Sequence, residues 1–69
     1  MYVKARSYYL KKGGQPIAYV MIKINLLTFK YKAEITLTNG NTYELFNQWA
    51  IDTEFDREIE LFVHRKILE

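Results

Sequence analysis

The dipeptide Asn39-Gly40, set between two alternating segments, is the feature that most constrains how this chain can fold. On both sides of it apolar residues alternate with polar ones: Ile35 and Leu37 before the dipeptide, Tyr43 and Leu45 after it. Asn-Gly in this setting is the strongest short-range signal for a β-hairpin, because both residues tolerate the positive φ of a two-residue type I′ turn. The pattern predicts strands at 29–38 and 42–46, with one buried and one solvent-exposed face.

The length of the chain, 69 residues, predicts a single domain spanning 1–69. A domain of this size buries only about 60% of the surface that its unfolded chain exposes, so its core is small. The absence of cysteine excludes disulfides and thiolate zinc sites, and leaves stability to the 49% of residues that are hydrophobic. Small domains without such cross-links often rely on self-association, so a homodimer is one expectation.

Two further strands are predicted at 2–10 and 17–25, separated by a loop that contains Gly13-Gly14. In the first strand, strict alternation predicts that even-numbered side chains face solvent and odd-numbered ones face inward. The connection at 25–28 is ambiguous, because antiparallel pairing needs a chain reversal there and only Asn25 is a turn former. A bulge or one long bent strand is the alternative.

The C-terminal segment predicts an amphipathic helix near 53–67. Its apolar residues recur at i, i+4, i+7 and i+8, the spacing of a helix stripe: Phe55, Ile59, Phe62 and Val63. Asp52 or Thr53 is a candidate N-cap, and the preceding connector at 46–51 has room for one helical turn. The predicted fold is therefore α+β: a four-stranded, mainly antiparallel β-meander with one C-terminal helix packed on one face.

The opposite side of this helix carries Leu61 and Leu68, far from the apolar stripe. Isolated leucines on a solvent-exposed face are common in monomeric proteins. They are equally suited to a contact between subunits. Leu61 and Leu68 are therefore candidate oligomer contacts as well as ordinary surface residues.

The charges are distributed unevenly along the chain, although the net charge is only +2. Residues 1–32 contain seven Lys and Arg and no acid, a charge of +7. Residues 33–69 contain eight acids against three Lys and Arg, a charge of −5. Such asymmetry indicates either an anionic partner or attraction between the two halves within the fold.

No motif for catalysis, cofactor binding or metal binding is apparent, and we expect a non-enzymatic protein. His64, the one histidine, has Glu60 four residues earlier, which predicts an ordinary surface pair on the helix. The run of acids at 52–60 lacks the central glycine of a calcium loop and follows a helical period. Gly13-Gly14 is followed by Pro16 and lacks the Gly-Lys-Ser/Thr signature of a phosphate-binding loop.

The outward-facing side chains of the sheet carry the functional prediction. Alternation places tyrosines among Lys and Arg there, and the expected partner-binding residues are Tyr2, Lys4, Arg6, Tyr8, Tyr19, Lys23, Lys30 and Lys32. This chemistry suits docking on an acidic protein surface, or edge-strand pairing, by a small regulator or inhibitor. The alternative is a nucleic-acid-binding protein that uses the same face, with bases stacked on the rings.

Composition adds two weaker expectations about the setting of the protein. Lys, Ile, Asn, Tyr and Phe are frequent, as in AT-rich genomes, which suggests a low-GC bacterium or one of its phages or mobile elements. No apolar stretch reaches the length of a membrane span, and the opening residues do not form a secretory signal. A cytoplasmic location without a membrane partner is therefore expected.

Overall fold

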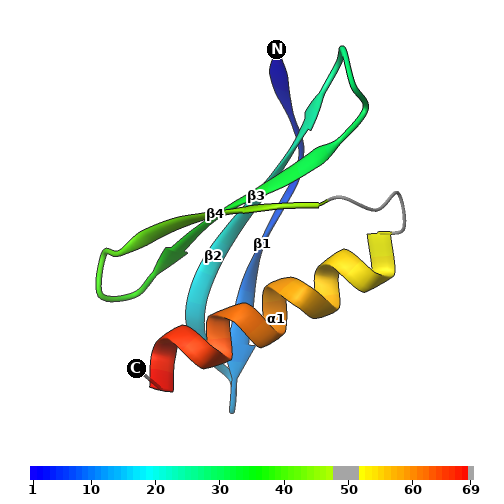
Figure 1. Ribbon diagram of the computed structural model, residues 1–69. Helices are drawn as coiled ribbons and strands as arrows, with labels where there is room; N and C mark the ends of the chain where they lie inside the picture. Colours follow the sequence, from blue (N-terminus) through cyan, green and yellow to red (C-terminus); the bar gives the residue numbers. More distant parts are fainter. Residues whose placement is uncertain (48–51, 69) are drawn as a thin grey trace.

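The computed structural model describes residues 1–47 and 52–68, the first two of the second range by their backbone alone. It contains one antiparallel sheet in the order β1-β2-β3-β4, followed by one helix (Figure 1). The elements are β1 (Tyr2–Lys12), β2 (Gln15–Asn25), β3 (Tyr31–Leu37), β4 (Thr42–Phe46) and α1 (Asp52–Leu68). The predicted α+β meander with a C-terminal helix on one face is confirmed.

The turn between β1 and β2 is a two-residue turn formed by Gly13 and Gly14. Their φ angles are 58° and 80°, and Lys12 pairs directly with Gln15. Two consecutive positive φ angles are the signature of the type I′ turn, and glycine adopts them without the steric cost of a Cβ atom. A loop of two residues is enough to reverse the chain here, and both strands extend further than predicted.

The turn around Asn39-Gly40 differs from the predicted type I′ geometry. The Leu37 amide donates to the Asn41 carbonyl over 2.8 Å and the Gly40 amide donates to the Leu37 carbonyl over 3.0 Å, which makes a three-residue loop. Only Gly40 has a positive φ, 93°, as in a turn followed by a glycine bulge. The Asn39 side chain accepts a hydrogen bond from the Asn41 amide instead of occupying the left-handed region.

The hydrophobic pattern explains why the longer loop forms. In the observed register Ile35 lies opposite Tyr43, so the apolar residues of both strands share one face. A two-residue loop over Asn39-Gly40 would shift the register by one and set Ile35 opposite Glu44. A shift by one residue exchanges the buried and exposed faces of a strand, so burial overrides the local turn preference.

The ambiguous segment after β2 forms a turn, and β3 begins at Tyr31 instead of Phe29. Asn25 organises this turn: its Oδ1 accepts from the Leu27 amide over 2.8 Å and its carbonyl accepts from the Phe29 amide over 2.7 Å. Its own amide donates to the Lys30 carbonyl over 2.9 Å. The alternative of one long bent strand is therefore wrong.

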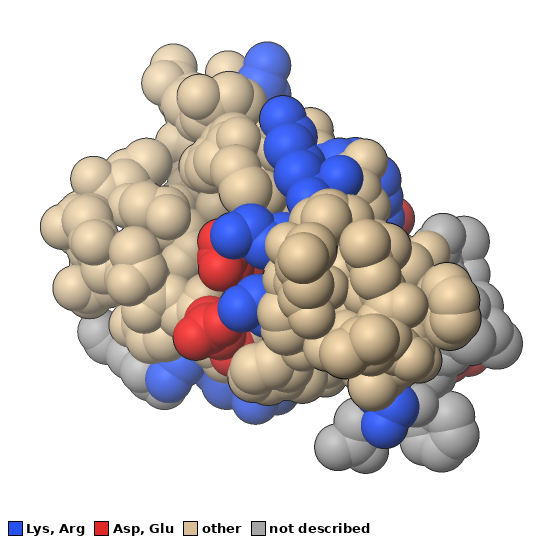
Figure 2. Space-filling model, turned by 90° about the horizontal axis from the view of Figure 1, so that it is seen from above, with Lys and Arg blue, Asp and Glu red and all other residues tan. Residues whose placement is uncertain are grey.

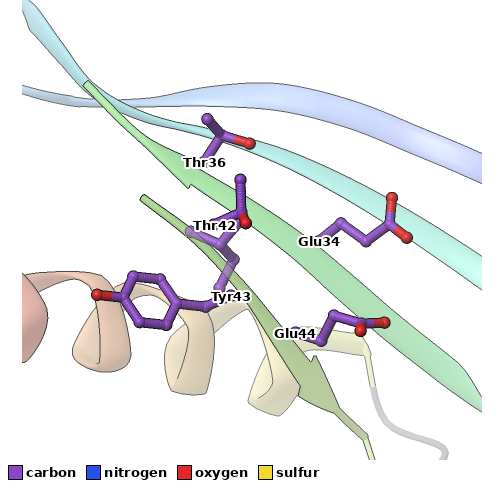
Figure 3. Close-up of a pocket in the computed structure, with 6 residues that line it drawn as sticks. Glu34, Thr36, Thr42, Tyr43 and Glu44 are labelled. Atoms are coloured by element: carbon purple, nitrogen blue, oxygen red, sulfur yellow. The ribbon is translucent and has the colours of Figure 1, made fainter. Parts of the chain in front are cut away.

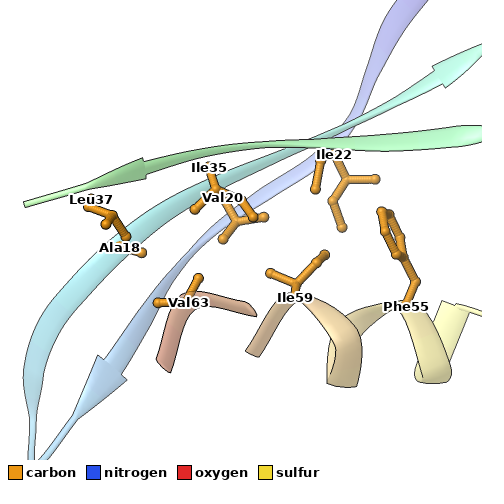
Figure 4. Close-up of a cluster of buried hydrophobic side chains, with 9 residues drawn as sticks. Ala18, Val20, Ile22, Ile35, Leu37, Phe55, Ile59 and Val63 are labelled. Atoms are coloured by element: carbon orange, nitrogen blue, oxygen red, sulfur yellow. The ribbon is translucent and has the colours of Figure 1, made fainter. Parts of the chain in front are cut away.

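The hydrophobic core lies between the sheet and α1 (Figure 4). Nine buried residues form it: Ala18, Val20 and Ile22 from β2, Ala33, Ile35 and Leu37 from β3, and Phe55, Ile59 and Val63 from α1. Phe62 completes the predicted helix stripe at its margin, with its ring 5.5 Å from that of Tyr43 in an edge-on contact. The side chains of the N-cap candidates Asp52 and Thr53 and residues 48–51 of the connector lie outside what the structure describes.

The register of β1 corrects one prediction. Lys4 pairs with Lys23, but Arg6 pairs with Ile22, so Ala5 is an extra residue at a β-bulge. Side chains beyond Ala5 therefore face the opposite way from strict alternation. The prediction that even-numbered residues of this strand face solvent holds for Tyr2 and Lys4 and is wrong for Tyr8 and Leu10, whereas Arg6 stays exposed but on the side of the sheet that faces α1.

Burial supplies the reason for this reversal. Tyr8 and Leu10 pair with Val20 and Ala18 and pack against the core, whereas Ser7 and Tyr9 lie on the other face. Without the bulge, Ser7 would occupy an inward position and Leu10 would be exposed. The extra residue therefore places the larger apolar side chains of this part of the strand inside.

We expect Ile59→Ala to lower the free energy of unfolding by about 2–5 kcal/mol, since Ile59 is fully buried and the truncation leaves a cavity. Leu61→Ala, two positions away and 56% exposed, should change it by less than about 0.5 kcal/mol. Urea denaturation followed by circular dichroism measures both. Equal effects of the two substitutions would show that the helix does not pack through this stripe.

Candidate functional site

The sheet face opposite α1, called here the outer face, is left uncovered by every element in the described ranges (Figure 1). The strand registers place on it Tyr2, Lys4, Ser7, Tyr9, Tyr19, Met21, Lys23, Lys32, Glu34, Thr36, Thr42, Glu44 and Phe46. It combines tyrosine rings with charges of both signs. The outer face is therefore the broadest candidate for binding among the described surfaces.

A row of three lysines crosses the outer face from β1 to β3. Lys4 lies opposite Lys23, which in turn lies opposite Lys32. Like charges directly opposite each other destabilise a sheet. Two glutamates in the next row, Glu34 and Glu44, face each other across β3 and β4 and supply the compensating charge.

Four of these charges form a continuous ion-pair network, called here the Lys–Glu network. The Lys23 ammonium lies 3.0 Å from Glu34 Oε1, and the Lys32 ammonium lies 3.5 Å from Glu34 Oε2 and 2.8 Å from Glu44 Oε2. Lys32 is the least exposed member, with 15% of its side chain accessible. The centre of the predicted basic face is therefore electrically balanced.

The Lys–Glu network lowers the pKa of Glu34 and raises the pKa of Lys32. The hydrogen bond from the Lys23 ammonium lowers the pKa of the Glu34 carboxyl. The hydrogen bond to the Glu44 carboxylate raises the pKa of the Lys32 ammonium. Each partner thus favours the charged form of the other near neutral pH, and the network holds across that range.

Tyrosine rings lie on both sides of the network. Tyr9 and Tyr19 are paired across β1 and β2 with ring centroids 5.0 Å apart, and Tyr9 is 62% exposed. Toward the other end of the strands, the Lys32 ammonium lies 4.4 Å from the centroid of the Tyr2 ring. The outer face therefore offers flat apolar surface beside paired charges.

Five of the eight predicted partner-binding residues lie together on the outer face: Tyr2, Lys4, Tyr19, Lys23 and Lys32. Lys30 lies in the exposed β2–β3 turn. For Arg6 and Tyr8 the predicted placement is wrong, because the bulge turns both toward α1. Tyr9 was not predicted to lie on the outer face. The sequence contains one sign that the alternation reverses, since the small Ser7 stands between the larger Arg6 and Tyr8.

Arg6 attaches β1 to the helix instead of meeting solvent on the outer face. Its guanidinium forms an ion pair with Asp56 of α1 and lies 5.3 Å from the centroid of the Tyr8 ring. Burial raises the pKa of the Tyr8 hydroxyl, and the nearby Asp56 carboxylate adds to that effect. These residues are therefore part of the helix–sheet contact.

A shallow depression on the outer face lies between β3 and β4 (Figure 3). The side chains of Glu34, Thr36, Thr42 and Glu44 border it, and Tyr43 points away toward the helix. Both carboxylates are ion-paired with Lys32, and Glu34 is also paired with Lys23. Within the described residues, no group of three His, Asp or Glu side chains is placed to hold a metal ion.

The solvent side of α1 agrees with the exposure predicted for it. Leu61 and Leu68 are 56% and 86% exposed, and their role as oligomer contacts stays a prediction. His64 Nε2 lies 3.9 Å from Glu60 Oε1, which confirms the predicted surface pair. In the described part of the chain, no helix has the length and apolar character that crossing a membrane requires.

The uneven charge along the chain is partly used inside the fold. Arg6–Asp56, Lys23–Glu34 and Lys32–Glu44 each join a residue of the basic segment 1–32 to one of the acidic segment 33–69. Attraction between the two segments therefore accounts for three of the seven cations. Lys4 and Lys30 form no ion pair with the described residues and are exposed.

The chain matches no protein-family model, and no curated protein or solved structure is significantly similar to it. Its function must therefore be inferred from its own surface chemistry. The outer face, with its tyrosines and paired charges, is the surface on which that inference rests.

We expect the Glu34→Gln substitution to flatten the acid side of the pH–stability profile. Because the folded-state pKa of Glu34 is lowered, its contribution is present above its unfolded pKa and is lost as pH falls through the folded value. Urea denaturation at several pH values below neutral measures this. Glu58→Gln, which removes an exposed helix carboxylate without an ion pair among the described residues, is the matched control. An unchanged acid slope in Glu34→Gln would contradict the network.

Proposed function

We propose that this protein is a small non-enzymatic regulator or inhibitor that binds another protein through the outer face of its sheet. The observation that carries the proposal is the uncovered outer face, where exposed tyrosines lie beside a balanced Lys–Glu network. Tyrosine and methionine are enriched at protein interfaces, because each buries a large area at a low cost in conformational entropy. Tyr9, Tyr19 and Met21 provide such area on neighbouring strands.

The surface area of the molecule supports association with a partner. The accessible surface is 5049 Å², above the roughly 4,600 Å² typical of a folded monomer of 8.3 kDa. With one helix packed on one side, the sheet leaves its second face to water. A partner that covers this face would bury part of that excess.

The distribution of charge favours a protein over a nucleic acid. A phosphate backbone gains affinity by contacting unpaired cations, but Lys23 and Lys32 are already paired with carboxylates. Glu34 and Glu44 would repel phosphates at the centre of the face. A protein surface can instead match a mixture of charges, and its acidic groups can meet the unpaired Lys4 at the margin.

The amino-acid composition of the chain bears on the kind of organism in which the proposed partner would be found. The bias toward Lys, Ile, Asn, Tyr and Phe supports an origin in an AT-rich phage or mobile element. The partner that we propose is a cytoplasmic host protein with an acidic surface.

The test uses the immobilised full chain to isolate binding proteins from a low-GC bacterial lysate. We expect a protein that wild type retains to be lost with the double substitution Tyr9→Thr and Tyr19→Thr, which removes both rings and keeps β-forming residues. The variant Leu61→Gln, altered on the helix, should retain it. Equal retention by all three chains would contradict the proposed face.

A separate titration distinguishes the nucleic-acid alternative. We expect single- and double-stranded oligonucleotides to bind weakly or not at all at low salt. Tight binding that falls steeply with salt would indicate phosphate neutralisation and would overturn the protein-binding proposal.

A further inference from the structure

The turn between β2 and β3 exposes a cluster of large apolar side chains, called here the hairpin tip. Leu27 and Phe29 are 83% and 71% exposed and Leu26 is 48% exposed. Met1, 76% exposed, lies beside them because its carbonyl accepts a hydrogen bond from the Leu26 amide over 2.9 Å. The tip stands clear of α1, at the other end of the molecule from the C-terminal turn of the helix (Figure 1).

Hydrogen bonds within the turn organise the backbone of the hairpin tip. Asn25 makes hydrogen bonds with the backbone of Leu27, Phe29 and Lys30, and Thr28 Oγ1 accepts from the Lys30 amide over 3.4 Å. Phe29 has φ of 58°, a left-handed conformation that a bulky residue adopts only when its surroundings impose it. The exposed ring of Phe29 contributes nothing to the core, so its apolar area is free to contact a partner.

The charge around the hairpin tip is positive. No acid occurs in residues 1–32, and Lys30 follows Phe29 directly. Lys4 lies on the neighbouring strand, and neither lysine forms an ion pair with the described residues. Viewed onto this end of the molecule, uncharged side chains occupy much of the surface, with Lys and Arg in a band beside them and Asp and Glu next to part of that band (Figure 2).

We propose that the hairpin tip inserts into the headgroup region of an anionic lipid bilayer. A protruding turn that exposes several large apolar side chains next to an exposed lysine combines the apolar and cationic groups that interfacial attachment to an anionic bilayer requires. The unpaired lysines behind the tip would then lie at the level of the anionic headgroups. This is interfacial attachment by a loop, which needs no membrane-spanning helix.

The proposed attachment is independent of the outer face and of the partner proposed above. The turn residues of the tip lie beyond the strand ends, whereas the tyrosine pair lies on the strands themselves. Failure of either proposal therefore leaves the other standing. If both hold, the protein would meet its partner at the membrane surface.

Vesicle sedimentation with the purified full chain tests the inference. Wild type should sediment with phosphatidylcholine–phosphatidylglycerol vesicles, remain in solution with phosphatidylcholine vesicles, and be released by salt. Phe29→Asn should lower the partition coefficient at least about fivefold, because it removes the ring and places at positive φ a residue that tolerates it. Lys30→Glu should lower it by a similar factor through the lost attraction.

Two controls exclude misfolding and general stickiness. Phe29→Asn should keep the circular dichroism spectrum and unfolding midpoint of wild type or raise the midpoint, since it relieves backbone strain. Leu61→Gln, which removes an exposed leucine far from the tip, should bind the anionic vesicles as wild type does.

Three outcomes would overturn the inference: no sedimentation with anionic vesicles at low salt, undiminished binding by Phe29→Asn, or an equal loss in Leu61→Gln. A protein captured by wild type and lost with Phe29→Asn, in the absence of vesicle binding, would assign the tip to a protein pocket instead.

Discussion

Burial of one sheet face beneath one helix is the interaction on which this structure depends. The nine buried side chains come from the two central strands and from α1, and the edge strands contribute only partly buried neighbours. In a chain of 69 residues without cysteine, no second core or cross-link can compensate for its loss. The local features of the strands are therefore arranged to keep apolar side chains on this one face.

Two departures from regular geometry serve that arrangement. The bulge at Ala5 turns Tyr8 and Leu10 inward, and the three-residue loop before Asn41 keeps Ile35 opposite Tyr43. In both places a simpler local structure would expose apolar side chains or bury polar ones. The resulting register also fixes which side chains remain on the outer face, so the core determines the composition of the candidate binding surface.

The outer face must be stable in water without a covering element, and the Lys–Glu network meets that requirement. The repulsion between Lys23 and Lys32, which lie opposite each other, is compensated by ion pairs with Glu34 and Glu44 in the next row. The result is a surface of mixed charge beside exposed tyrosines. The hairpin tip is different, since its apolar side chains are exposed and Lys30 forms no ion pair with the described residues. The molecule thus presents two surfaces of distinct chemistry, which suit different kinds of contact.

The sequence was sufficient to predict the elements and the helix stripe, because those depend on the period of the apolar residues. It did not reveal the bulge, since one extra residue changes the face of a strand without changing its composition. Arg6 and Tyr8 were assigned to the wrong face for that reason. The Lys–Glu network was also missed, because it depends on cross-strand register, which a single sequence specifies only through the core.

The bulge at Ala5 determines which side chains of β1 lie on each face of the sheet, and interstrand nuclear Overhauser effects test it directly. If the bulge is present, we expect backbone contacts between Arg6 and Ile22 and side-chain contacts between Tyr8 and Val20. Contacts of Arg6 with Met21 and of Tyr8 with Tyr19 would show regular pairing. That result would return Arg6 and Tyr8 to the outer face and contradict the structure of the site.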